Sequence, residues 1–194
     1  KPTTTPPFTE LAAQIQGEVH TDPLRRYQLS TDASIFRKMP AAVVYPRSTE
    51  DVQATVRFAV HYGLSVHPRG AGSGLCGSAV GDGVVVDFSK YMNRLLHLDL
   101  AQGYCECEPG YRLGELEAAL KGSGRWFPPD PSSGEYATFG GMCATNASGA
   151  HSVKYGNVAD YLLDAQVVFA DGSMEMLSAL QAADPDELPR PLAQ

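Results

Sequence analysis

Hydrophobic residues alternate between continuous runs and helical spacing in the region from residue 41 to residue 69. The runs AAVVYPR and LSVHPR, residues 41–47 and 64–69, predict two buried strands. Between them an apolar face repeats at helical spacing, with Ser48 as the N-cap and Gly63 at the end. That face consists of Val52, Val56, Ala59 and Val60. Strand, helix and strand together predict a right-handed βαβ unit with parallel strands.

The N-terminal part contains one periodic segment. FTELAAQIQGE, residues 8–18, predicts a short helix with Thr9 as its cap and Gly17 as its stop. The stretch that follows shows no period up to about Met39. We expect it to be irregular.

Three further elements follow the βαβ unit. The segments MNRLLHLDL and GYCECEPG alternate apolar and polar residues and predict an antiparallel pair of strands. YRLGELEAALKGSG predicts a helix that buries Leu113, Leu116 and Leu120. YLLDAQVVFADGSMEML predicts a hairpin that turns at Asp171 and Gly172.

The segment HPRGAGSGLCG, residues 67–77, begins in the second predicted strand and continues into the loop after it. Gly72, Gly74 and Gly77 match the dinucleotide fingerprint G-x-G-x-x-G. A Rossmann unit needs a helix of ten or more residues after this loop, but only SAVGDG separates it from the next strand, VVVDF. The match is therefore interpreted as accidental. An NAD-linked dehydrogenase would require a helix at this point.

The glycine content of this region still needs a physical reason. Six glycines lie between Gly70 and Gly83, and glycine loses more conformational entropy on folding than any other residue. Unpaired backbone amides that curve around an anion are one structure that needs such a sequence. We therefore expect an anion-binding loop between two strands.

A second glycine-rich segment, TFGGMCATNASGAHSVKYG, occupies residues 138–156. Its small side chains are typical of backbone that lies close to a flat or phosphorylated group. The loop WFPPDPSS before it is stiffened by proline and is excluded from a central strand.

Composition and charge exclude several classes of protein. The chain has 194 residues, 43% of them hydrophobic, and can bury a core. Its formal net charge of -7 argues against nonspecific nucleic-acid binding or an anionic membrane surface. The apolar runs are much shorter than the roughly 20 residues needed to cross a bilayer, and the N-terminus has no signal-peptide pattern. We expect a cytoplasmic protein, or one peripheral to the inner face of a membrane.

The four cysteines show no ligand-like spacing. Cys105 and Cys107 lie two residues apart on a predicted strand, too close in sequence for an unstrained mutual disulfide. We expect all four cysteines, including Cys76 and Cys143, to be reduced and to act as small buried packing residues.

Six motifs occur in a recognisable order: AVVYPRSTEDV, VHPRGAGSGL, PPDPSS, FGGMCATNASG, VKYG and VVFADGS. Together they resemble the FAD-binding PCMH-type domain of the vanillyl-alcohol oxidase family. They are most similar to the glycolate oxidase and D-lactate dehydrogenase group of FAD-linked oxidases, especially those fused to an iron–sulfur region. The resemblance covers residues 29–176. It implies an α+β fold with a small βαβ lobe, a larger lobe with a mainly antiparallel sheet, and FAD between them.

The resemblance also implies which residues bind the cofactor. The FAD pyrophosphate is expected at Pro68, Arg69, Gly70, Ala71, Gly72, Ser73, Gly74 and Leu75. The ribityl chain and isoalloxazine are expected at Pro129, Asp130, Gly140, Gly141, Ala144, Thr145, Asn146 and Gly149. Covalent-flavin relatives place a His in the glycine loop, where this chain has Gly72 and Ser73, so noncovalent FAD is implied, with the Cys76 thiol as the exception to test.

The residues themselves leave simpler interpretations open at several of these positions. Asp130 lies between prolines and is a typical turn former, and Asn146 is a typical cap or turn residue. Arg69 suits either a phosphate contact or an ordinary surface ion pair. His67 on an apolar strand is commonly a hydrogen-bonded structural histidine.

These observations divide the chain into an N-terminal extension (1–39), an incomplete FAD-binding domain (40–177) and a linker or disordered tail (178–194). The resemblance implies the FAD-binding portion of an oxidoreductase that converts a D-2-hydroxy acid, such as D-lactate, glycolate or 2-hydroxyglutarate, to a 2-oxo acid. In the family, the substrate-binding groups come from a downstream domain. We therefore assign no catalytic residue and no metal site, and expect no turnover and weak FAD occupancy by this chain alone.

Two points stay open at this stage. The electron acceptor is not indicated by any motif. A noncatalytic module that holds a nucleotide or assembles with another subunit is the alternative function.

Overall fold

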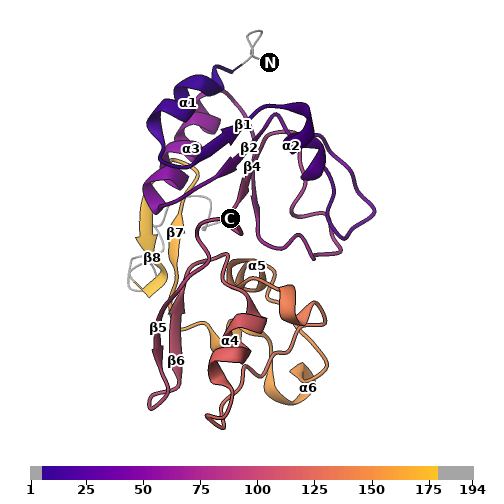
Figure 1. Ribbon diagram of the computed structural model, residues 1–194, viewed down its shortest axis with the longest axis vertical. Coiled ribbons are helices and arrows are strands. Elements are labelled where there is room, and N and C mark those ends of the chain that lie inside the picture. Colours follow the sequence, from indigo (N-terminus) through magenta and orange to yellow (C-terminus); the bar gives the residue numbers. More distant parts are fainter. Residues whose placement is uncertain (1–5, 179–194) are drawn as a thin grey trace, which may run out of the picture.

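A four-stranded sheet forms the upper part of the molecule in the computed structural model, which describes residues 6–178 (Figure 1). Its strands are β1 (Glu18–His20), β2 (Ala42–Tyr45), β3 (Val66–Arg69) and β4 (Val84–Asp87). Their order in the sheet is β1-β2-β4-β3. Strand β4 is parallel to both β2 and β3, whereas β1 pairs antiparallel with β2.

The predicted βαβ unit is present, but its two strands are not neighbours. Strand β4 lies between β2 and β3, and all four of its residues are buried. Strand β3 lies at the edge and contains Pro68, which cannot donate a ladder hydrogen bond. The central position therefore goes to the strand with the continuous apolar run.

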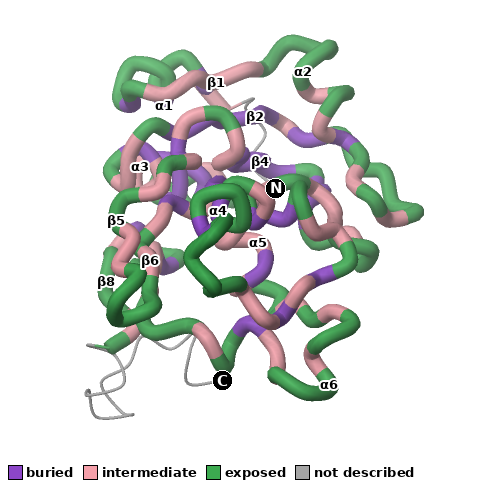
Figure 2. The backbone as a smooth tube through the Cα atoms, turned by 60° about the horizontal axis from the view of Figure 1, so that its bottom comes forward, coloured by how far each residue is buried: buried purple, intermediate pink, exposed green. Residues whose placement is uncertain are grey.

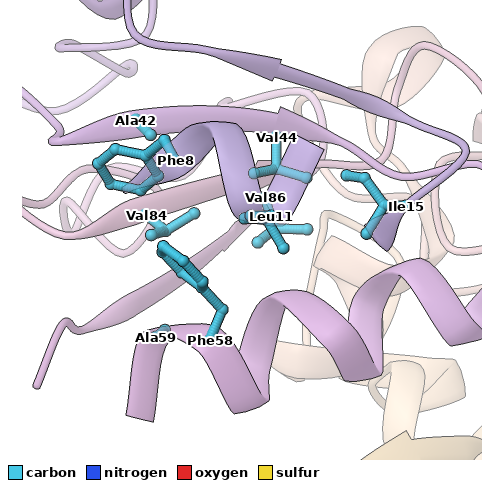
Figure 3. Close-up of a cluster of buried hydrophobic side chains, with 9 residues drawn as sticks. All are labelled: Phe8, Leu11, Ile15, Ala42, Val44, Phe58, Ala59, Val84 and Val86. Atoms are coloured by element: carbon cyan, nitrogen blue, oxygen red, sulfur yellow. The ribbon is translucent and has the colours of Figure 1, made fainter. Parts of the chain in front are cut away.

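Two helices cover one face of this sheet. Helix α1 (Phe8–Gln14) and helix α3 (Thr49–His61) pack their apolar side chains against alternate residues of β2 and β4 (Figure 3). The cluster consists of Phe8, Leu11, Ile15, Ala42, Val44, Phe58, Ala59, Val84 and Val86. Full burial of one such large apolar side chain contributes about 1.5–3 kcal/mol. The core therefore joins the N-terminal helix to the parallel strands.

Helix α3 matches its predicted ends but not all of its predicted face. Ser48 accepts a hydrogen bond from the Asp51 amide, and Gly63 adopts a left-handed φ of 63° just after the helix. Val60 was expected inside, but 57% of it is exposed. Phe58 is buried instead, on the same face as Thr55 and Ala59, and its ring packs against Phe8 of α1.

The N-terminal stretch predicted to be irregular contains strand β1 and helix α2. Helix α2 (Pro23–Gln28) starts behind Asp22, whose side chain accepts from the Arg25 amide at 3.0 Å. Asp followed by Pro is a recognised helix start that the sequence analysis missed. Thr9 does not cap α1, which follows Pro7. The division at residue 39 stays a prediction.

The second group of elements lies below the sheet in Figure 1. It contains the antiparallel strands β5 (Leu95–Asp99) and β6 (Tyr104–Cys107), helices α4 (Leu113–Leu120), α5 (Phe139–Ala144) and α6 (Ser152–Tyr155), and the 3-10 helices η1 (Gly134–Tyr136) and η2 (Val158–Tyr161). The predicted strand pair and the three buried leucines of α4 are confirmed.

A hairpin of β7 (Gln166–Val168) and β8 (Met174–Met176) lies beside α3 (Figure 1). Its turn carries Gly172 at a φ of 80°, as the Asp-Gly pair predicted. The Gly172 carbonyl accepts hydrogen bonds from Gln53 and Arg57 of α3 at 2.8 and 3.1 Å. The hairpin therefore packs against the part of the molecule that contains the four-stranded sheet, which we call the sheet lobe.

The residues of the two central strands, β2 and β4, are all buried. Figure 2 shows buried backbone along β2 and β4 and exposed stretches at α2 and α6. All four cysteines are free, as predicted. Three are partly buried, but Cys76 is exposed, because it lies in the loop after β3 rather than in the core. No helix within residues 6–178 is long and apolar enough to span a membrane.

The tail predicted from residue 178 onward falls almost entirely on residues 179–194, which lie outside the described part of the chain.

Candidate cofactor-binding site

The glycine loop joins β3 to β4 without a helix. Residues 70–83 contain only turns and bends between Arg69 and Val84. The G-x-G-x-x-G match is therefore accidental, as predicted, and the NAD-linked hypothesis, which required a helix after Gly77, is wrong.

The backbone amides of this loop are available. Within the described residues, the N–H groups of Gly70 through Ala79 donate no hydrogen bond to any other group of the protein. Buried or half-buried amides are nearly always paired in native structures. Successive free amides on a curved path form a site for an anion. This run of amides is the feature that best fits a diphosphate.

Glycine is required at two points of the loop for different reasons. Gly72 has a φ of 67°, a left-handed conformation that favours glycine. At Gly70 the requirement is space, because a β-carbon there would clash with the side chain of Thr138. Gly70 therefore lets the end of β3 approach the start of α5, and the two glycine-rich segments meet.

Arg69 contacts the protein's own backbone. Its Nη1 donates to the carbonyl oxygens of Thr31 at 2.8 Å and Ala79 at 3.5 Å, and its guanidinium lies against Gly72. Within the described residues it forms no ion pair with a carboxylate. The surface ion pair considered above is therefore wrong, and a contact with a phosphate stays a prediction.

His67 forms the hydrogen bond expected of a structural histidine. Its Nε2 lies 2.9 Å from the Ser65 hydroxyl, and its ring packs against Gly81. Partial burial lowers the pKa of His67 below its usual value of 6.5, since the charged imidazolium is disfavoured out of water.

Asp130 and Asn146 adopt left-handed backbone conformations, with φ values of 42° and 45°. The Asp130 carboxylate pairs with His151 Nδ1 at 3.0 Å, and Asn146 Oδ1 accepts from the Ala159 amide at 2.9 Å. Both therefore act as turn residues. Their implied contacts with FAD are untested. Gly149 packs against the Asp130 carbonyl, where a β-carbon would clash.

Helix α5 presents small residues beside the glycine loop. The Gly140 amide donates to the Pro109 carbonyl at 2.8 Å, and Thr145 Oγ1 donates to the Gly141 carbonyl at 2.9 Å. Ala144 completes this segment, and Pro129 lies in the preceding loop, where its carbonyl accepts from the Ser152 hydroxyl.

The two glycine-rich segments meet at a contact that we call the seam. One buried polar atom at the seam has no hydrogen-bond partner within the described residues. Thr138 Oγ1 lies between Gly70 and Gly141 and forms no hydrogen bond within the described residues. An unsatisfied buried hydroxyl costs free energy, so such groups commonly mark a site that another molecule completes. Sequence analysis missed Thr138, although a threonine before Phe-Gly-Gly is recognisable as a helix start.

The free amides, the close approach at Gly70 and Gly141 and the unpaired Thr138 hydroxyl together fit a ligand that carries a diphosphate. A family model for a FAD binding domain matches residues 40–178, more than half of the chain. The chain belongs to this family of FAD-binding domains. The resemblance drawn from the six ordered motifs is thereby confirmed, and FAD is the cofactor of the family.

Curated relatives of this FAD-binding domain are hydroxy-acid dehydrogenases and oxidases by name. The D-2-hydroxyglutarate dehydrogenase of Escherichia coli (strain K12) is 38% identical over 161 residues, covering 81% of this chain and 16% of the relative. A probable mitochondrial D-lactate dehydrogenase of Danio rerio is 38% identical over 152 residues, covering 77% and 30%. A glycolate oxidase subunit of Bacillus subtilis is 32% identical over 140 residues, covering 72% and 30%.

The chain thus spans 16% to 30% of the length of these three relatives. Among solved structures, an alkyldihydroxyacetonephosphate synthase aligns with a TM-score of 0.75 at 27% identity, covering 87% of this chain and 34% of that one. The 6-hydroxy-D-nicotine oxidase of Arthrobacter nicotinovorans aligns with a TM-score of 0.72 at 26% identity, covering 90% and 37%. The predicted mixed α/β fold of this FAD-binding domain is confirmed.

Proposed function

We propose that this FAD-binding domain holds FAD noncovalently and serves an enzyme that oxidises a D-2-hydroxy acid to a 2-oxo acid. The substrate class is supported by the names of the relatives, which share a 2-hydroxy carboxylate as substrate. When bound, FAD supplies the two-electron oxidation. The described residues supply binding and orientation, and we assign none of them to the proton transfer.

The free amides after Arg69 carry this proposal. They lie at the end of an edge strand, and none is used by a helix or by the sheet. Backbone amides stabilise a diphosphate through charge-assisted hydrogen bonds, which are stronger than neutral ones. Gly140 packs closely against Pro109 and Gly141 lies beside the Thr138 hydroxyl, so α5 starts next to these amides.

Noncovalent attachment is proposed because this chain has Gly72 and Ser73 at the position where a histidine is implied for a covalent flavin link. Denaturation of the loaded protein with acid is expected to release all of the flavin into the supernatant. Flavin that stays with the precipitated chain, and is lost from a Cys76→Ser variant, would show attachment through that thiol.

Titration of the 194-residue chain with FAD tests the function directly. We expect flavin fluorescence to change on binding, with weak affinity. A tight one-to-one complex would contradict the expected weakness but support the site. A protein that ignores FAD while assembling with another subunit would favour the noncatalytic alternative.

The variant Gly74→Leu tests the position of the site. A β-carbon at Gly74 makes only an ordinary contact with Ser78, so the fold tolerates a side chain there, but leucine would cover the free amides. We expect FAD affinity to fall at least about tenfold, equivalent to about 1.4 kcal/mol, with the free energy of unfolding unchanged.

The matched control is Gln102→Leu, which adds the same side chain to the exposed turn between β5 and β6. Equal FAD affinity in Gly74→Leu and Gln102→Leu would place the cofactor elsewhere. The downstream domain and a cytoplasmic location stay predictions.

A further inference from the structure

A segment outside the matched family span runs along the glycine loop. We call residues 30–38, which follow α2, the brace segment. Near the start of the loop, the Thr31 carbonyl accepts from Arg69 at 2.8 Å. Two residues further along the brace segment, the Ala33 amide donates to the Gly72 carbonyl at 2.9 Å.

The contacts continue in the same order toward the end of the loop. The ring of Phe36 lies against Gly77, so closely that a β-carbon on this glycine would clash with it. Lys38 then pairs with Asp82, with its Nζ 3.1 Å from Oδ2. The brace segment and the loop therefore lie side by side, in the same direction, over nearly their whole length.

The brace segment is itself held in place. Its ends are joined by the Lys38 amide, which donates to the Ser30 carbonyl at 2.8 Å. Ser30 is buried, and its hydroxyl donates to the Tyr27 carbonyl at the end of α2 at 2.7 Å. A bridge between Thr31 and Arg37 closes the segment further. The loop therefore rests on a structured support.

These contacts use the parts of the loop that an anion does not need. They engage the Gly72 carbonyl, the face of Gly77 and the side chain of Asp82, and they leave the amides of residues 70–79 free. A loop this rich in glycine has large conformational freedom when nothing holds it. The brace segment restricts the path of the loop without consuming its donors.

We propose that the brace segment orders the glycine loop for the diphosphate of FAD, with Phe36 and Lys38 as positioning residues. The inference rests on the proposed function for its ligand. When only a fraction of molecules holds the loop in the binding conformation, the apparent affinity falls by that fraction. Loss of the brace should therefore weaken FAD binding without removing any group that touches FAD.

The test compares Phe36→Ala with Ile35→Ala in the full chain. Ile35 is the neighbouring residue on the brace segment and is 95% exposed. Two quantities are measured: the 1H–15N heteronuclear NOE of residues 70–79 without cofactor, and the dissociation constant for FAD. For Phe36→Ala we expect lower NOE values in the loop and about tenfold weaker FAD binding. Ile35→Ala should match the wild type, and Phe36→Leu should restore most of the affinity.

Several results would overturn the proposal. Unchanged NOE values and affinity in Phe36→Ala would show that the loop orders itself, and equal effects of Phe36→Ala and Ile35→Ala would show a nonspecific disturbance. Lower NOE values with unchanged affinity would remove the link to the cofactor. Lys38→Met, which keeps the aliphatic stem but loses the ion pair to Asp82, provides the same comparison if Phe36→Ala fails to fold.

If the proposed function is wrong, the results of the two measurements differ from those above. A wild-type chain that does not bind FAD refutes that function, whereas the NOE comparison still decides whether the brace segment orders the loop.

Discussion

A single buried carboxylate, that of Asp51, connects separate elements of this domain through hydrogen bonds. Asp51 is 3% exposed and accepts hydrogen bonds from the amides of Gln16, Gly17 and Arg47, each at 2.9 Å. One side chain thus ties the end of the N-terminal helical segment to the start of α3. Its place in the sequence suggested only an acidic residue suited to the first turn of a helix.

His67 makes the stability of the domain depend on pH. Burial lowers its pKa in the folded state below the usual 6.5, so the unfolded chain binds the proton more readily. The free energy of unfolding should therefore fall as pH drops through about 6.5. Urea unfolding between pH 7.5 and 5.5 should show a smaller loss in His67→Gln than in the wild type.

The exposed His97 of β5 provides the control for this measurement. His97→Gln should keep the wild-type pH dependence. Identical curves for His67→Gln and the wild type would exclude His67 as the responsible group.

The place of each helix and strand in the fold depends on the residues against which it packs. Strand β4 takes the centre of the sheet because its buried valines need cover on both faces, and β3 takes the edge because of Pro68. The hairpin of β7 and β8 docks on α3 through the Gly172 carbonyl. The edge position of β3 places the loop that follows it at an edge of the sheet.

Two glycine variants distinguish the packing of the hairpin on α3 from the conformational requirement of its turn. Gly172→Ala and Gly122→Ala both force alanine into a left-handed conformation, at φ values of 80° and 82°, which costs about 1–2 kcal/mol each. Only at Gly172 would the new β-carbon also strike Arg57. Gly172→Ala should therefore reduce the free energy of unfolding more than Gly122→Ala; equal losses would mean that Arg57 moves aside freely.

The whole molecule brings its two glycine-rich segments together at Gly70 and Thr138. The buried Thr138 hydroxyl has no partner there within the described residues. Such a group destabilises the free protein and becomes useful only when a ligand supplies the missing hydrogen bond. This seam between the lobes is where the proposed cofactor would complete the structure.

Replacement of Thr138 by valine tests whether its hydroxyl lacks a hydrogen-bond partner in the protein without FAD. Without FAD, Thr138→Val should raise the free energy of unfolding by about 1 kcal/mol, because an unsatisfied hydroxyl is replaced by a methyl group of similar size. Thr55→Val is the matched control: its buried hydroxyl donates to the Asp51 carbonyl at 2.7 Å, so this variant should be less stable. A loss of stability in Thr138→Val would show that its hydroxyl already has a partner, such as water.

The local sequence was sufficient for features that depend on neighbouring residues. The spacing between Gly77 and the next strand excluded a crossover helix, the leucines of α4 marked its buried face, and Asp171 with Gly172 marked the hairpin. Turn conformation, helical periodicity and loop length act over a few residues, so each can be recognised where it occurs.

Contacts between distant segments were decided by the tertiary structure alone. The pairing of Gly70 with Thr138, of Phe36 with Gly77 and of the Asp51 carboxylate with the amide of Gly17 joins residues that are 34 or more positions apart. None of these pairs carries a pattern of its own, because a glycine that needs space looks the same in sequence as one that needs a positive φ. Packing of the complete chain determines which neighbour fills the space.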